Sequence, residues 1–352
     1  MTLKKVLLLA GLVVAAALAA CGGGSAGGAP AAVGDKAPVV PARGAAQAQT
    51  PAPSLITSLV LMAPNPTYAM GSEELAAFNI LNTARSQCGF GKLAQSTQMD
   101  NAARAHNDYQ IINSTISHSE DRVTAPIGFT GVTGFDRVLA AGYTGAQSVS
   151  DEFVAQTKSS NKVGIGERGM RGLLNAPYHM VGLLGGNQDV GISARSSTET
   201  SPQGVIAAVF LHVNTAYKTV TGPQLIGVND VATYPCSGSI GIHRQLTNET
   251  PNPVPGRDLE LNPIGSSVYI LLREGHVLTI TSAVMVETLT NAVIVLRTPV
   301  TMANDPHLSF KSNEGYVAPD APLKALTQYS VDISGTNSGV PFTRQFIFTT
   351  GA

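Results

Sequence analysis

Two histidines and two acids that lie far apart in the sequence are the side chains best suited to chemistry. They are His118 in ISHSED, the adjacent Asp151 and Glu152 in SVSDEF, and His179 in NAPYHMVGLL. Each lies in a short polar patch beside an apolar segment, as residues do when loops bring them together. The pattern therefore predicts one pocket lined by these four side chains.

Two imidazoles and a carboxylate supply the protein ligands of an open Zn²⁺ site, in which water completes the coordination shell. His118 and His179 are therefore the candidate ligands for zinc or another divalent metal. Two other interpretations stay open: a wet polar cavity in which histidine and acid pair, and general acid–base catalysis by a histidine that a carboxylate orients. Ser117 and Ser119 are common loop residues, and no activated nucleophile is evident in the sequence.

The remaining histidines are better explained without a site. His106 lies on the apolar stripe of a predicted helix and His212 lies in the apolar stretch VFLHV, so both are predicted to be hydrogen-bonded histidines of the core. Glu167 in GIGERG is a candidate fourth acid of the pocket, although a charge in such a stretch is more often solvated. The other three histidines are predicted to form no cluster: His243, His276 and His307.

The composition limits the classes of function. The chain has 352 residues, enough for two domains, and 43% of them are apolar, so a sizeable core can form. The formal net charge is −1, without the basic excess that binds a phosphate backbone, which argues against nucleic acid as a partner. Trp is absent and aromatic residues make up 5% of the chain, which argues against a stacking platform for bases or sugars.

The N-terminus carries the pattern of an export signal. Lys4 and Lys5 precede the apolar run Val6–Ala20, which is shorter than the roughly 20 residues that a membrane-spanning helix needs. The run ends Leu-Ala-Ala-Cys and continues with Gly and Ser, which resembles the lipobox of bacterial lipoproteins. The resemblance implies that residues 1–20 are a signal peptide and that Cys21 carries lipid. It places the chain in the cell envelope of a bacterium, anchored to a membrane through this lipid. The Gly after the cysteine resembles the type sorted to the outer membrane, on its periplasmic or surface face.

Helical patterns come first and strand patterns follow. Ser72 and Ser96 are predicted N-caps of two long helices, and Gly89 ends the first of them. Further helical pieces are predicted at 135–141, 151–156, 164–174 and 177–184. Apolar, β-rich runs follow at 190–194 and 204–213. This order predicts an α+β arrangement.

A series of motifs in this region resembles the CAP superfamily, in its bacterial SCP-like (PR-1-like) branch. The stretches that carry the resemblance, in order, are LNTARSQCGFGKL, AARAHNDY, SHSED, PIGFTG, DRVLAAGYTG, NAPYHMVGLL and DVGIS. The resemblance implies an α-β-α sandwich in which two histidines and acids line a central cavity. It also implies that a divalent metal can bind there, as in some members of the family.

The chain departs from the family pattern beside the candidate site. Ser150-Asp151-Glu152 stands where the family has Gly-Glu-Asn, so either acid can occupy the position of the family's Glu. Met180 follows His179 where the family has Arg, and Leu173 stands in place of a usual Trp. These departures leave the choice between Asp151 and Glu152 open.

The cysteines predict one disulfide. If Cys21 carries lipid, Cys88 and Cys236 remain as an even pair in an oxidising compartment. A bridge between them would tie the segment after the last strand of the first region back to its first helix.

The C-terminal part is predicted to be a second, all-β domain. Strands are predicted at 266–272, 276–286, 291–298, 328–334 and 343–350, with turn residues between them. The last stretch resembles the final hairpin of bacterial immunoglobulin-like domains, in which Tyr329 takes the place of the corner tyrosine. The predicted organisation is a signal peptide at 1–20, a lipidated cysteine and disordered Ala/Gly/Pro tether at 21–70, a CAP domain at 71–235 and an Ig-like sandwich at 236–352.

Taken together, the sequence favours a cell-envelope lipoprotein that is not an enzyme. Its CAP domain would be a binding or interaction module for a small lipidic ligand, a divalent metal or an envelope partner. Two alternatives stay open. One is an envelope hydrolase that acts on peptide or peptidoglycan with a histidine and an acid of the cavity. The other is a purely structural adhesion protein.

Overall fold

The computed structural model describes residues 58–200 and 206–352, which belong to one compact unit, Ala52–Ala352. The signal peptide and lipidated cysteine predicted from the sequence, and most of the tether, lie outside the described residues. Within the described ranges, no helix is both long enough and apolar enough to cross a membrane.

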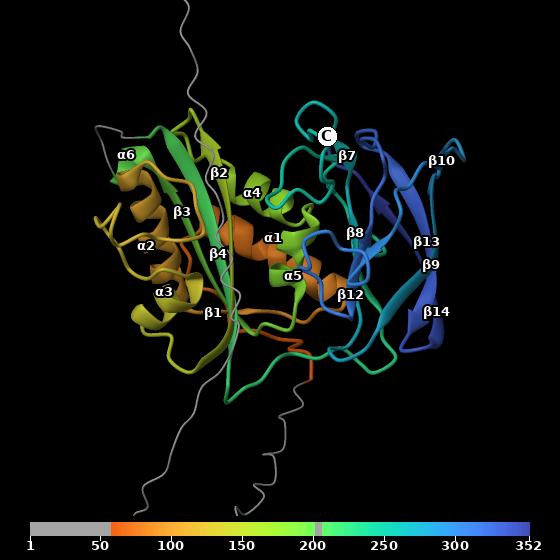
Figure 1. Ribbon diagram of the computed structural model, residues 1–352, viewed down its shortest axis with the longest axis horizontal. Helices are drawn as coiled ribbons and strands as arrows, with labels where there is room; N and C mark the ends of the chain where they lie inside the picture. The colour runs from red at the N-terminus through yellow and green to blue at the C-terminus, as the bar shows by residue number, and fades with distance from the viewer. Residues whose placement is uncertain (1–57, 201–205) are drawn as a thin grey trace, which may run out of the picture. The chain divides into compact units, whose positions relative to one another are not determined.

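The N-terminal region is a mixed sheet with helices on both faces. The sheet has the strand order β1-β3-β4-β2, with β1 parallel to β3 and the other pairs antiparallel. Its strands are β1 Ala94–Gln95, β2 Ala146–Thr157, β3 Asp189–Ser196 and β4 Ala208–Lys218. The helices of the region are α1 Glu73–Cys88, α2 Thr97–Asn113, α3 Gly134–Ala140, α4 Ile165–Leu173, α5 Pro177–Leu184 and α6 Ser197–Thr200. Helices α2 and α3 lie on one side of the sheet, and α1, α4 and α5 lie on the other (Figure 1). The predicted α+β class is confirmed.

The two long helices begin where their capping residues predict. The Ser72 hydroxyl accepts a hydrogen bond from the backbone N–H of Leu75 at 3.2 Å, and the Ser96 hydroxyl accepts one from Met99 at 3.4 Å. Each bond satisfies one of the N–H groups that the first turn of a helix leaves without a partner. Gly89 ends α1 with a φ of 84°, a left-handed conformation that a side chain disfavours.

The helical piece predicted at 151–156 is wrong, because this segment lies within strand β2. Asp151 pairs with Asn214 and Gln156 with Val209, in a ladder that β2 and β4 share along their length. The segment is too short for a local helical preference to outweigh this pairing with a buried strand. Its extended backbone has a consequence for the site, because consecutive side chains of a strand point to opposite faces.

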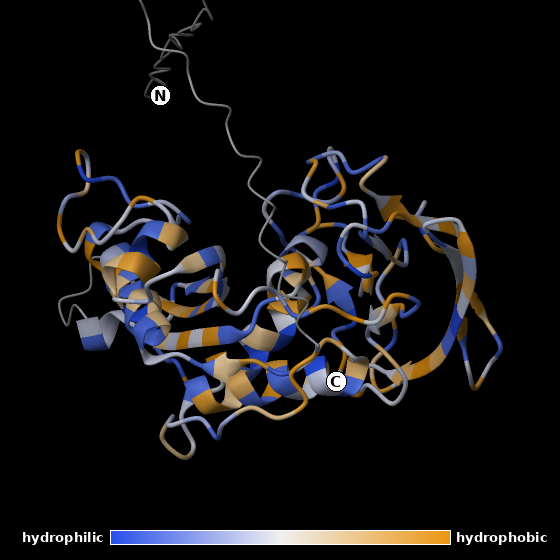
Figure 2. Cartoon of the chain, turned by 90° about the horizontal axis from the view of Figure 1, so that it is seen from below, coloured by the Kyte–Doolittle hydropathy of each residue, from blue (hydrophilic) through white to orange (hydrophobic). Residues whose placement is uncertain are grey.

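The C-terminal region consists mostly of antiparallel strands, as predicted. One four-stranded sheet has the order β11-β12-β8-β5 and another has the order β10-β9-β13-β14; β6 and β7 form a separate pair. The strands are β5 Ala232–Tyr234, β6 Gln245–Leu246, β7 Ile264–Gly265, β8 Val268–Leu271, β9 Leu278–Glu287, β10 Val293–Ile294, β11 Val300–Thr301, β12 Glu314–Val317, β13 Gln328–Asn337 and β14 Val340–Thr349. Buried and less buried residues alternate along β13, and the strands at the right of Figure 2 carry hydrophobic and hydrophilic bands.

Tyr329 ties the start of β13 to the preceding loop. Its ring is buried, and its hydroxyl accepts a hydrogen bond from the backbone N–H of Lys324 at 2.9 Å. This is the kind of contact that a corner tyrosine makes. The immunoglobulin-like identity of the region and the division of the chain at residue 236 stay predictions.

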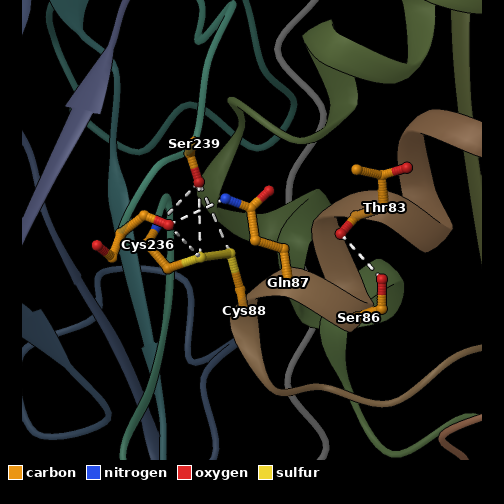
Figure 3. The surroundings of a disulfide bond; sticks show 7 residues. Thr83, Ser86, Gln87, Cys88, Cys236 and Ser239 are labelled. Atoms are coloured by element: carbon orange, nitrogen blue, oxygen red, sulfur yellow. Dashed lines mark hydrogen bonds between the residues drawn. A yellow bond between two sulfur atoms is a disulfide. The ribbon is translucent and has the colours of Figure 1, made fainter.

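The predicted disulfide joins α1 to the segment after β5. The sulfur atoms of Cys88 and Cys236 are 2.09 Å apart, and the two residues are separated by 148 positions in the sequence. Gln87 supports the bridge by donating to the carbonyl of Ser237 at 2.9 Å, and the Ser239 hydroxyl lies 3.6 Å from the Cys236 sulfur (Figure 3). One continuous cluster of buried apolar side chains also extends from α1, α4 and α5 into the C-terminal sheets.

Removing the disulfide should lower stability strongly, because the bridge closes a long loop in the unfolded chain. We expect the double variant Cys88→Ser/Cys236→Ser to lose about 3–5 kcal/mol in the free energy of unfolding, measured by urea denaturation of the full chain. Ser86→Ala is the control, since its hydroxyl bonds only the carbonyl of Thr83 in the same helix. Equal midpoints for the double variant and the unaltered chain would contradict this expectation.

Candidate functional site

The two candidate acids lie on opposite faces of strand β2. Asp151 faces α3, where a Cβ on Gly134 would come within 2.5 Å of the Asp151 Cβ. Glu152 faces α5, where a Cβ on Gly182 would clash with a Glu152 carboxylate oxygen. Both glycines therefore allow a helix to approach the strand closely at an acid. The sequence left open which acid faces the pocket; the structure places the two acids on opposite sides of the sheet, and neither is among the residues that line the cavity with His118 and His179.

Asp151 is the centre of a buried charge cluster. Its carboxylate accepts a hydrogen bond from Arg137 at 2.7 Å and lies 2.6 Å from His212 Nε2 and 3.3 Å from His118 Nδ1. Burial alone would raise the pKa of Asp151, but His212, His118 and Arg137 together hold the pKa of this carboxyl well below its usual range. Asp151 is therefore ionised, and three neighbouring side chains stabilise its negative charge.

A second histidine–acid pair lies behind this cluster. His106 Nδ1 is 2.9 Å from Glu120 Oε1, and its Nε2 is 2.9 Å from the carbonyl oxygen of Ser117. Burial is the main cause that lowers the pKa of His106. The His106 ring lies edge-on to that of His212, with centroids 5.0 Å apart. Both are fully buried, hydrogen-bonded core histidines as predicted, although the partner of His212 is one of the candidate site acids.

On the other face of β2, His179 lies between two carboxyl groups. Its Nδ1 is 2.5 Å from Glu152 Oε2, and the Ser150 hydroxyl donates to the second oxygen of Glu152 at 2.6 Å. Burial would lower the pKa of His179, but the hydrogen bond and charge of Glu152 and the charge of Glu249 raise it above the usual histidine value. His179 is thus more readily protonated than an ordinary histidine.

Glu249 reaches this face from the C-terminal region. Its Oε1 accepts hydrogen bonds from the backbone N–H groups of Tyr178 at 2.7 Å and His179 at 3.3 Å, in the first turn of α5. The N-cap residue Ala176 has no side chain that could do this, so Glu249 caps the helix from a distant part of the chain. Burial raises the pKa of Glu249 to about 7, and its Oε2 is a buried oxygen without a hydrogen-bond partner in the structure.

A cavity of about 790 Å³ connects the two faces at the outer edge of β2. His118 enters it from the α3 side of the sheet and His179 from the α5 side, and His243 and Glu249 complete its polar wall. Its apolar lining includes Ile116, Phe153, Val154, Leu173 and Leu246. The His118 side chain is 51% exposed and that of His179 is 15% exposed, so His118 lies at the more open side.

The arrangement does not fit a metal ion shared by His118 and His179. Each imidazole has its Nδ1 next to a different acid, and the two acids lie on opposite faces of β2. Among residues 58–200 and 206–352, no three His, Cys, Asp or Glu side chains form a group able to hold a metal.

Several predicted residues are not part of the cavity. Glu167 is exposed on α4 and pairs with Arg171 at 3.1 Å, in line with a solvated charge. His276 lies 2.5 Å from the Asn337 side-chain oxygen, and His307 lies 2.7 Å from the carbonyl of Asn252. His243 lines the same cavity as His118 and His179, and the prediction that it forms no cluster with other histidines stays a prediction.

The sequence reasoning missed Arg137, His212, His243 and Glu249 as site residues. Arg137 lies in the stretch DRVLAAGYTG, and His212 lies two residues after Phe210 on the same face of β4. Neither position indicates which acid the side chain contacts. Glu249 is 70 positions from His179, so no spacing rule connects them. The only signal was indirect, since the N-cap Ala176 left α5 without a capping side chain.

Comparison with known proteins assigns no family. No protein family model matches the chain. No curated protein matches it in sequence. Among solved structures, 43% of the chain matches 96% of an outer surface protein from Borrelia burgdorferi, with 12% sequence identity and a TM-score of 0.33. A likeness this weak carries no argument about function, and the resemblance to the CAP superfamily stays a prediction.

The raised pKa of Glu249 should make stability depend on pH. An unfolded Glu titrates near 4.5, whereas native Glu249 titrates near 7, so the native state holds its proton over that interval. The unaltered chain should therefore lose stability as the pH rises from about 4.5 to 7, by up to about 3 kcal/mol from this group. Glu249→Gln keeps the acceptor oxygen but cannot ionise, so its stability relative to the unaltered chain should increase over the same interval. Urea unfolding at a series of pH values measures this, with the exposed Glu167→Gln as control; parallel profiles for all three proteins would refute the assignment.

The charge of Arg137 should be indispensable to the fold. The guanidinium is 1% exposed, and its removal leaves Asp151 buried without its permanent counter-charge. We expect Arg137→Met to cost about 3 kcal/mol or more in unfolding free energy. Arg104→Met is the matched control, because Arg104 is exposed on α2 and bonds only Asn101 three positions away. A loss no larger than that of the control would show that the histidines alone compensate Asp151.

Proposed function

We propose that the chain is a ligand-binding module of the cell envelope, and that its ligand occupies the cavity at the edge of β2. The observation that carries the proposal is the pairing of imidazoles with acids beside an apolar-lined space of about 790 Å³. Binding sites commonly combine such an apolar lining with a few polar groups that fix orientation. Anchoring through a lipid on Cys21 and location in the bacterial envelope are part of the same proposal and rest on the sequence pattern.

The polar wall suits a ligand with both apolar and polar parts. His179 can donate a hydrogen bond or carry a positive charge, because its pKa is raised, and Glu249 keeps one oxygen free of partners. Phe153, Val154 and Leu246 offer apolar contacts on the same cavity. The ligand would place its polar groups at His179 and Glu249 and its apolar groups against the lining.

The geometry favours binding over hydrolysis through a covalent nucleophile. Ser117 Oγ accepts a hydrogen bond from the N–H of Ser119, and none of the hydrogen bonds among the described residues joins a hydroxyl or thiol to His118 or His179. The general base of a nucleophilic hydrolase needs such a contact with its nucleophile. The adhesion alternative makes the opposite prediction from ours, since it assigns no role to the cavity histidines.

A fluorescent reporter of the cavity tests the proposal. The full chain should bind 1-anilinonaphthalene-8-sulfonate, whose rings suit the apolar lining and whose sulfonate suits a protonated His179. We expect His118→Ala/His179→Ala to weaken binding at least about tenfold in a fluorescence titration, a change of about 1.4 kcal/mol. The control is His276→Ala, since His276 lies outside the cavity lining. Equal binding by the double variant, with an unchanged circular dichroism spectrum, would exclude the histidines as the site.

A further inference from the structure

We propose that the ligand is an extended polypeptide segment that binds as an added strand along the free edge of β2. This inference rests on the proposed ligand-binding function and names the ligand class.

Strand β2 is a terminal strand of its sheet. In the order β1-β3-β4-β2, its single neighbour among the described strands is β4. One side of its backbone therefore forms the ladder with β4, and the other side has no strand next to it. The residues along this edge are also partly accessible to solvent, because Phe153, Val154 and Ala155 are each only half-buried.

The hydrogen bonds of β3 show which of its residues direct their backbone N–H and C=O groups toward β4. The N–H groups of Ile192 and Ala194 donate to the side chains of Asp100 at 2.7 Å and Glu74 at 3.0 Å. The backbone groups of these even-numbered residues of β3 therefore point away from β4. In an antiparallel ladder, both backbone groups of a residue point to the same side and alternate along the strand. It follows that the odd-numbered residues of β3 bond their even-numbered partners in β4.

The same alternation assigns the backbone directions of β2. Since the even-numbered residues of β4 face β3, its odd-numbered residues face β2, and Val213 and Leu211 pair with Glu152 and Val154. The N–H and C=O groups of Asp151, Phe153 and Ala155 must therefore point outward, to the free edge. None of the hydrogen bonds found in the described part of the chain uses these groups. Unpaired groups of this kind are a template for another strand.

The cavity of about 790 Å³ lies along this edge and is lined by Phe153, Val154, Ala155 and Thr157 of β2. Adjacent residues of a strand point to opposite faces, so a cavity that touches several in a row lies at the strand edge. At about 3.3 Å per residue, the edge from 151 to 157 is roughly 20 Å long.

The side chains beside the edge indicate the chemistry of the added strand. Alternate residues of that strand would point to opposite faces. Those on the α3 side would meet the rings of Phe153 and His118, whose centroids are 4.6 Å apart. Those on the α5 side would meet His179 and the unpaired oxygen of Glu249. The occupant that fits is an extended segment of another protein in which apolar side chains alternate with hydrogen-bond donors, held by backbone bonds as in other strand-addition complexes.

Backbone-specific changes on both partners test the proposal. The probe is a random linear heptapeptide library displayed on phage and selected on the full chain, followed by synthesis of an enriched peptide. Ala155→Pro removes an outward N–H without touching the ladder with β4, and Ala155→Val keeps that N–H while adding similar bulk. We expect the proline variant to bind the peptide at least tenfold more weakly than the valine variant.

The peptide backbone gives a readout that holds even if the proline variant fails to fold. Methylation of single peptide nitrogens should weaken binding by the unaltered protein at every second position, and bound peptide should slow amide hydrogen exchange in the segment 150–157. Failure to enrich any peptide, methylation effects without this period of two, or equal binding by the proline and valine variants would each overturn the proposal. So would a dimer of the full chain that Ala155→Pro dissociates, because the occupant would then be a second copy. If the dye still depends on the cavity histidines in any of these cases, the proposed binding function stands and only the peptide assignment falls.

Discussion

The alternation of side chains along β2 is the constraint on which the candidate site depends. Pairing with β4 holds the strand extended, so Asp151 and Glu152 cannot face the same way. Each acid then needs its own partners for its charge. The helices that carry those partners approach on different faces, and Gly134 and Gly182 permit their close approach. The cavity joins the two faces only at the strand edge, where the sheet ends.

The acids on the two faces of β2 differ in the groups that balance their charge. Asp151 has a permanent counter-charge in Arg137, so its cluster contains an ionised carboxylate that is compensated within the protein. Glu152 and Glu249 instead have His179, whose charge depends on protonation, and burial raises the pKa of Glu249 to about 7. The α3 side therefore resembles a structural support, whereas the α5 side can change its protonation near neutral pH. A ligand that donates hydrogen bonds to Glu249 would therefore bind on the α5 side.

The C-terminal region is part of the site rather than an appendage. It supplies Glu249 as the cap of α5 and His243 to the cavity wall. The disulfide fixes the segment after β5 to α1, and Asn175 beside α5 donates to the carbonyl of Gln245 at 2.8 Å. These contacts hold the outer wall of the cavity against the helices of the first region, and the free edge of β2 lines the same cavity.

The sequence by itself determined the features that depend on neighbouring residues or on simple counting. The caps at Ser72 and Ser96 were predictable because capping depends on neighbouring residues, and the Cys88–Cys236 pair was predictable because the chain has only three cysteines. Only the tertiary structure decided the strand at 146–157, the division of the two acids between opposite faces, and the roles of Arg137 and Glu249. Each of these depends on contacts between residues far apart in the chain. The residues of a short segment such as SVSDEF do not specify which strand will pair with it. Burial, which raises the pKa of Glu249, exists only once the whole fold has formed.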